Sequence, residues 1–180
     1  MLPLAGILIS RAFMSASITT YLPTYLSSEG ADLWIAGASL SILEAAGVVG
    51  VLVGGSMSDR VGRRVILLSS MIATPLFAVV FLLASGVQQI VVLPFLGFFA
   101  LSTTPVMMAW VQESYPENRA LANGIFMAMA FVIRAVVIVI IGRVGDTYGL
   151  GLGILISAVI MAAGIPLVFL LPGKTLPESV

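Results

Sequence analysis

The sequence predicts an all-α membrane protein with six transmembrane helices and almost no chain left for a soluble domain. Of the 180 residues, 60% are hydrophobic and 9% are charged, whereas a soluble domain averages roughly 45–50% apolar and about 25% charged residues. Six apolar segments reach the roughly 20 residues that a helix needs to cross a bilayer, and no alternating pattern indicates the strands of a barrel. We therefore expect one transmembrane domain over 1–180 in the cell or inner membrane.

The six predicted spans have short polar connections, so consecutive helices run antiparallel. The spans are 4–27, 33–57, 65–85, 90–111, 120–141 and 150–171, and the connections are 27–32, 58–64, 86–89, 112–119 and 142–149. No connection is long enough to hold a catalytic domain. One side of the membrane receives Arg60, Arg63, Arg64, Arg119 and Lys174, and the other receives only Arg143. Because basic residues gather in cytoplasmic loops, we expect both termini to be cytoplasmic.

Composition excludes several classes of function. Eight basic residues balance eight acidic ones, and the chain has neither Cys nor His. A nucleic-acid-binding protein would show a basic surface, so nucleic acid is not an expected partner. Disulfides, Cys/His zinc sites and His-based catalytic triads are excluded, and we expect no metal, no cofactor and no enzymatic activity. The expected partners are the lipid bilayer and a small-molecule substrate.

The spans differ in polarity. The first contains Arg11 and many Ser, Thr and Tyr residues, and the fourth has three hydroxyl residues, 102–104, before Pro105. Proline often kinks a helix, and a helix as polar as the first needs a wet or protein-lined neighbourhood. Either these hydroxyls bond to their own helix backbone, or spans one and four line a cavity. Spans three and six, with few polar groups, are expected on the lipid-facing outside. Span two has small residues at every fourth position, which predicts close packing: Ala46, Gly50, Gly54 and Ser58.

The chain contains an internal repeat. The pattern G-x-x-x-D-x-x-G occurs twice, 87 residues apart: at Gly55, Asp59 and Gly62, and at Gly142, Asp146 and Gly149. Three spans separate the copies, which places them on opposite membrane faces. Secondary transporters commonly use such inverted repeats of three plus three helices, so we expect units of about 1–86 and 87–180. The competing explanation is chance agreement in a Gly-rich chain.

The first copy of the pattern also carries Arg60, Arg63 and Arg64. Its glycines permit a tight turn with positive φ. Asp59 is placed to meet a helix N-terminus, where backbone amides favour an anion. A helix cap combined with a positive-inside anchor would explain the arginines, but it would not explain the Gly-Asp-Gly spacing or its second copy.

The run Gly55-Ser-Met-Ser-Asp59-Arg60-Val-Gly62-Arg63-Arg64 resembles the signature loop of the major facilitator superfamily, G-x-x-x-D-R-x-G-R-R/K. It lies between the second and third spans, where that family carries it. The resemblance covers the whole chain, as one six-helix half of the usual twelve-helix transporter. The opening span, the 112–124 segment and the Pro-Gly-Lys-Thr-Leu-Pro-Glu tail look like a C-terminal half. The pattern is most similar to drug and metabolite efflux members such as the fosmidomycin-resistance group.

The resemblance implies alternating access, in which two halves rock about a central site while a proton or ion gradient drives antiport or efflux of a small organic solute. It also implies that Asp59 latches the cytoplasmic side against a helix end of the opposite half, with Arg60 and Arg63 as basic partners. The chain has the length of one half and starts without a basic leader, so we expect either a fragment or a natural half. A natural half would pair with another chain or form a homodimer, since a two-fold axis reproduces the family arrangement. The alternative function is a non-transporting membrane scaffold or truncated product.

Three charged residues lie inside the predicted spans: Arg11, Glu44 and Arg134. A charge at the bilayer centre costs about 2.5–3.5 kcal/mol even on a lenient scale, so such residues are functional candidates. Each arginine could instead extend to a membrane surface, and Glu44 could be protonated and neutral. In a homodimer, Glu44 would meet the partner's Arg134 and would be the proton-coupling candidate. Tyr21 and Tyr25 are substrate-site candidates, in competition with a packing role.

Overall fold

The computed structural model describes residues 2–170, with side chains from residue 4 onward. Every regular element of this part is helical: α1 (Leu2–Ser28), α2 (Leu33–Val61), α3 (Arg63–Leu83), α4 (Val87–Leu101), α5 (Thr104–Ser114), the 3-10 helix η1 (Pro116–Asn118), α6 (Arg119–Tyr148), α7 (Leu150–Ala163) and α8 (Ile165–Phe169). The predicted all-α class is confirmed. Lys174, the end of the sixth predicted span and the 172–178 tail lie outside the described residues.

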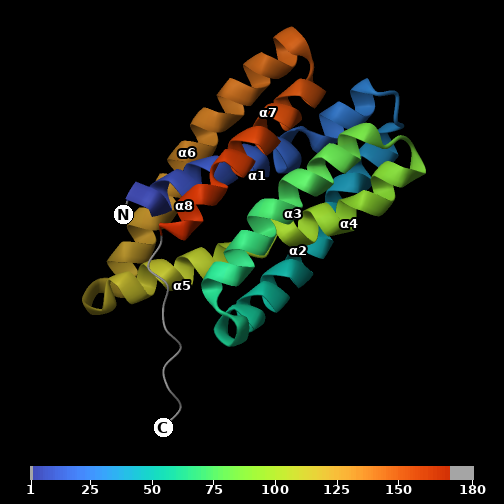
Figure 1. The fold of residues 1–180 in the computed structure, drawn as a ribbon. Helices are drawn as coiled ribbons and strands as arrows, with labels where there is room; N and C mark the ends of the chain where they lie inside the picture. Colours follow the sequence, from blue (N-terminus) through green and yellow to red (C-terminus); the bar gives the residue numbers. More distant parts are fainter. Residues whose placement is uncertain (1, 171–180) are drawn as a thin grey trace.

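The helices pack into a bundle with α2 and α6 at opposite edges (Figure 1). α1 contacts α2, α6 and α7, and α3 contacts α4 and α7. Their shared core includes Leu22, Leu67, Met71, Leu96 and Ile154, all fully or almost fully buried. The bundle therefore has α2 and α6 at its edges, with α1, α3 and α7 between them (Figure 1).

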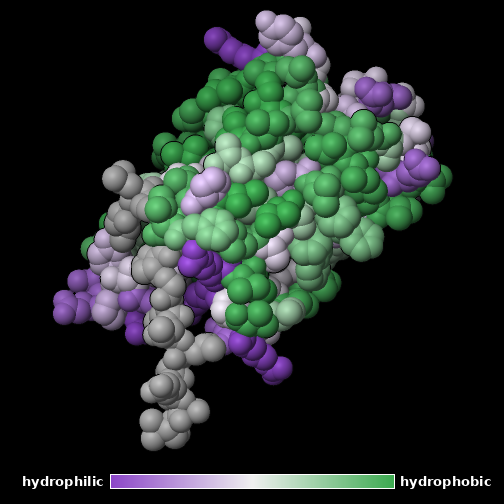
Figure 2. Space-filling view, viewed as in Figure 1, coloured by the Kyte–Doolittle hydropathy of each residue, from purple (hydrophilic) through white to green (hydrophobic). Residues whose placement is uncertain are grey.

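Within the part of the chain that the structure describes, five helical stretches are long and apolar enough to cross a membrane: α2, α3, α4 with α5, η1 with α6, and α7 with α8. α1 is 27 residues long but is not among the stretches found within the described residues. Figure 2 shows apolar residues across the middle of the visible face and hydrophilic residues gathered at its ends. This distribution fits a bilayer, and a sixth span through α1 stays a prediction.

Two predicted connections, 58–64 and 142–149, are helical for most of their length, so these boundaries are wrong. α2 and α6 continue until a single glycine, Gly62 or Gly149, leads directly into the next helix. The two glycines have φ of +98° and +91°, and each donates its amide to the carbonyl four residues earlier. Hydropathy falls where polar residues begin, whereas the helical hydrogen bonds continue to the glycine. The expected positive φ is confirmed at Gly62, while Gly55 lies inside α2.

The fourth predicted span is interrupted. A turn at Ser102 and Thr103 separates α4 from α5, which has Pro105 in its first turn. Proline lacks the amide hydrogen, and its ring crowds the carbonyl four residues earlier, so the continuous ladder of hydrogen bonds ends here. Pro166 has the same position in α8 and accompanies a break of the sixth predicted span at Gly164. The expected effect of proline on span four is therefore confirmed as a break.

α2 approaches α4 along its stripe of small residues. A Cβ on Gly50 would collide with the carbonyl of Phe98, and a Cβ on Gly54 would collide with the turn after α4. From the other side, Gly97 of α4 meets the carbonyl of Leu43 in the same way. The predicted close packing is confirmed at Gly50 and Gly54.

α2 and α6 are the most exposed spans. Within their most apolar windows, 17% of α6 and 28% of α2 is buried, against 39% for α3 and for α7 with α8. The expectation that spans three and six are outermost does not hold for this chain by itself, because α3 and α7 pack against each other. The faces of α2 and α6 are left open instead.

Candidate functional site

Arg11 lies across the interface between α1 and the break that separates α4 from α5. Its Nη1 donates to the Sδ of Met107 at 2.9 Å and its Nη2 to the carbonyl of Ala100 at 3.2 Å, while its buried Nε has no hydrogen-bond partner. Ala100 is in the last turn of α4, where carbonyls lack intrahelical partners. Arg11 therefore points into the bundle and does not extend to a membrane surface.

Arg134 and Glu44 do not meet within the chain. Arg134 is exposed on α6 and donates from Nη2 to the Oγ1 of Thr19 at 2.8 Å. The Thr19 hydroxyl in turn donates to the carbonyl of Ser15 in α1 at 2.8 Å. Glu44 is exposed on α2 and forms no hydrogen bond or ion pair within residues 2–170. A pair between Glu44 and Arg134 requires a second copy and stays a prediction.

Tyr21 and Tyr25 join α1 to its neighbours. The Tyr21 hydroxyl donates to the carbonyl of Ile138 in α6 at 2.7 Å. Tyr25 is 6% exposed, and its ring lies 5.8 Å from that of Phe81 between centroids. These are packing contacts between helices, and the substrate role expected of the two tyrosines stays a prediction.

The arginines after Gly62 tie the junction of α2 and α3 to the ends of two other helices. Arg63 forms an ion pair with Glu113 at the end of α5, with side chains 21% and 34% exposed. Arg64 donates to the carbonyl of Phe169 at 3.1 Å and lies over its ring, 5.0 Å from the centroid. Sequence reasoning missed both partners, although Glu113 follows span four on the same predicted side of the membrane.

Asp59 and Arg60 are exposed near the end of α2 and form no hydrogen bond or ion pair in the described part of the chain. No side chain caps the start of α3, so the expectation that Asp59 meets a helix N-terminus is not met by this helix. The latch role implied by the resemblance stays a prediction. In the second copy of the pattern, Asp146 is likewise exposed, and a Cβ on Gly142 would collide with the Tyr21 hydroxyl.

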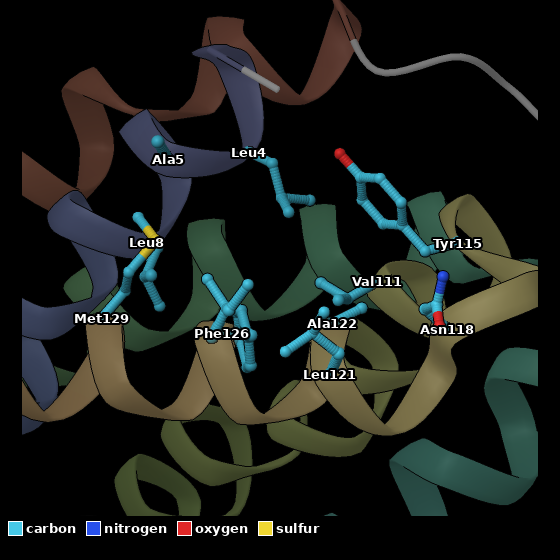
Figure 3. A pocket seen from close by; sticks show the side chains of 11 residues that line it. Leu4, Ala5, Leu8, Val111, Tyr115, Asn118, Leu121, Ala122, Phe126 and Met129 are labelled. Carbon is cyan, nitrogen blue, oxygen red and sulfur yellow. The ribbon is translucent and has the colours of Figure 1, made fainter.

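An apolar pocket of about 530 Å³ lies between the start of α1, the end of α5 and the start of α6. Figure 3 shows Leu4 and Leu8 of α1 facing Phe126 of α6, with Tyr115 and Asn118 where α5 gives way to α6. The full lining is Leu4, Ala5, Leu8, Val111, Tyr115, Asn118, Leu121, Ala122, Ile125, Phe126 and Met129. None of the predicted site residues is among them. The signal available in the sequence was the three- and four-residue spacing of apolar positions in α6.

Comparison with known proteins identifies the family. The sequence matches the Major Facilitator Superfamily over residues 4–180. It is similar to the uncharacterized MFS-type transporter YfnC of Bacillus subtilis, with 31% identity over 126 residues, which are 70% of this chain and 31% of that protein. It is also similar to the fosmidomycin resistance protein of Escherichia coli, with 25% identity over 165 residues, or 91% of this chain and 41% of that protein.

The chain thus spans about a third to two fifths of the length of these relatives. Proteins of the matched family are transporters and not enzymes, which agrees with the function class predicted from the sequence. Because the family match covers nearly the whole chain and the helices have the length and hydropathy of membrane spans, the chain belongs to the Major Facilitator Superfamily of integral membrane transporters.

Proposed function

We propose that this chain is one half of a secondary active transporter that exports a small organic solute by alternating access, coupled to a proton gradient. The observation that carries the proposal is that the two least buried spans, α2 and α6, also hold the exposed charges Glu44 and Arg134. Charged side chains inside a membrane face protein or a water-filled cavity and not lipid. We therefore expect these faces of α2 and α6 to contact a protein partner, which we take to be a second six-helix half.

The proposal includes a single domain built from inverted repeats of about 1–86 and 87–180, with both termini cytoplasmic. Its support is that a shift of 87 residues superposes helix boundaries. Shifted α2 falls on 120–148, and α6 spans Arg119–Tyr148; shifted α3 falls on 150–170, and α7 with α8 spans Leu150–Phe169. Gly62 and Gly149, each with positive φ, become equivalent junctions.

The second half is either a different segment or another copy of this chain. In a two-fold homodimer, Glu44 faces the partner's Arg134 and carries the coupled proton, and Asp59 latches onto the partner subunit. The charge swap Glu44→Arg with Arg134→Glu tests this arrangement by oligomeric mass in detergent and by transport. We expect each single change to impair both and the double change to restore dimerisation. Single changes that leave assembly and transport intact would contradict the homodimer.

Transport itself is tested in proteoliposomes with an imposed pH gradient, with fosmidomycin as the first compound because one relative is named for resistance to it. We expect movement that depends on the gradient and is lost in Glu44→Gln. The control is Glu29→Gln, an exposed carboxylate just beyond α1, which should transport normally. A folded chain that moves no compound, alone or co-reconstituted with a partner half, would support the alternative of a non-transporting membrane scaffold or truncated product.

A further inference from the structure

Arg11 is a partly buried cation that has no carboxylate partner within residues 2–170. Its two hydrogen-bond acceptors, the thioether of Met107 and the carbonyl of Ala100, are neutral, and its buried Nε has no partner. No carboxylate pairs with it anywhere in residues 2–170. Buried charges in proteins are normally paired, and membrane-embedded ones mark ligand or ion pathways. The guanidinium can therefore still donate hydrogen bonds to an acidic group, and residues 2–170 do not supply that group.

The lining of the apolar pocket comes within about one helical turn of this cation, although Arg11, Met107 and Ala100 are not themselves part of the lining. Leu8, which lines the pocket, precedes Arg11 by three residues, on the same face of α1 and about 4.5 Å away along the axis. Val111, also in the pocket lining and visible in Figure 3, follows Met107 by about one turn of α5. On α1 and on α5, the residue about one turn from the pocket lining is therefore Arg11 or its hydrogen-bond acceptor Met107.

The charges around this path favour an anion. Arg134 adds a second cation to the same helix through Thr19, about 12 Å beyond Arg11 along α1. The carboxylates at the pocket end are Glu113, which pairs with Arg63, and Glu117, which is exposed in η1 between the pocket-lining Tyr115 and Asn118 and is followed closely by Arg119; Glu44 is exposed on α2. α1 itself contains no acidic residue, and Arg11 together with the Arg134 bound to Thr19 makes this stretch of the helix positive.

We propose that the pocket binds small amphipathic organic anions, with their apolar body between α1 and α6 and their acid group on Arg11. The inference rests on the proposed transport function and names its substrate class. An acid group accepts paired, charge-assisted hydrogen bonds from a guanidinium, and these are stronger than the bonds to the thioether and carbonyl that it would replace. An organic cation with the same apolar body would meet a like charge.

Isothermal titration of the purified chain with phenylbutyrate, phenylbutanol and phenylbutylamine tests the charge preference, because the three compounds share one apolar body. We expect the anion to bind about tenfold or more tighter than the alcohol and the amine to bind weakest. Arg11→Gln should lower the affinity for the anion to that for the alcohol. Arg11→Lys should keep part of the preference for the anion over the alcohol. Arg143→Gln, an exposed arginine of α6 outside the pocket, is the matched control and should change nothing.

Ala122→Phe, which fills the pocket, should weaken all three compounds and tests the site even if Arg11→Gln does not fold. Equal affinity for anion and alcohol, or a preference that survives Arg11→Gln, would overturn the proposal. Titration in nanodiscs with and without an anionic phospholipid separates a free organic anion from a lipid headgroup, and competition by the lipid would also overturn it. Anion binding without transport refutes the proposed function alone, whereas transport of cations that does not depend on Arg11 refutes this inference alone.

Discussion

The close approach of α2 and α4 predicts opposite outcomes for two Gly→Ala changes in the same helix. At Gly50 a Cβ would collide with the backbone carbonyl of Phe98, so relief requires one helix to move. At Gly37, which is exposed near the start of α2, no atom lies within 4 Å of an added Cβ. Each change removes the same conformational freedom from the unfolded chain, and only the first adds a collision.

The magnitudes follow from these contacts. Alanine in place of glycine stabilises a helix interior by about 0.5–1 kcal/mol, and Gly37→Ala should raise the free energy of unfolding by this amount. Overpacking costs about 1–3 kcal/mol, and a backbone contact places Gly50→Ala toward the upper end. Because the gain in helix propensity is common to both variants, the difference between their free energies of unfolding measures the collision alone. For a chain of this size, each kcal/mol shifts Tm by about 2–4 °C.

Thermal unfolding of the two variants in one detergent, followed by far-UV circular dichroism, measures this difference. Gly97→Ala, whose Cβ would meet the Leu43 carbonyl, should behave like Gly50→Ala. We expect both to melt several degrees below Gly37→Ala. Equal melting temperatures for Gly50→Ala and Gly37→Ala would refute the close packing of α2 on α4.

Three further changes test other contacts by the same unfolding measurement. Tyr21→Phe removes the hydrogen bond from α1 to α6 and should cost about 0.5–1.5 kcal/mol, whereas Tyr148→Phe, which is 75% exposed, should have no effect; equal losses would contradict this role of Tyr21. A double-mutant cycle on Arg63 and Glu113 should give a coupling of at most about 1 kcal/mol, because the pair is partly solvated, and a coupling of several kcal/mol would contradict that reasoning. Gly149→Ala forces a side chain into backbone with φ of +91° and ψ of 147°, a region used essentially by glycine alone, and should destabilise the chain by about 1–3 kcal/mol; an unchanged Tm would show that the junction adopts another conformation.

The helical class was predictable because a long apolar run in a bilayer can satisfy its backbone groups only as a helix or a closed barrel. The residues at which the helices end were less predictable. Asp59 and Arg60 are polar enough to suggest a loop, yet they extend α2, whose ladder of hydrogen bonds ends only at Gly62. Pro105 predicted a disturbance of span four, but a proline by itself does not decide between a smooth bend and the two-residue interruption observed at Ser102 and Thr103.

The contacts of the candidate site were out of reach for sequence reasoning. Arg11 meets groups 89 and 96 residues away, and Tyr21 meets a carbonyl 117 residues away. Such contacts depend on how far each helix is rotated and shifted against its neighbour, which the apolar periodicity of a single helix does not specify. The pocket likewise needs three separate segments to be in place before it exists.

The single-residue junctions at Gly62 and Gly149 have a mechanical consequence. Consecutive Cα atoms are about 3.8 Å apart, so one linking residue leaves the joined helix ends with almost no slack. Each glycine therefore allows the two joined helices to change their angle but not to move apart. A partner that displaces the open face of α2 therefore also displaces α3, and one that displaces α6 also displaces α7. These two helices, α3 and α7, pack against each other. A displacement at either edge of the bundle is therefore transmitted to the same contact, the one between α3 and α7.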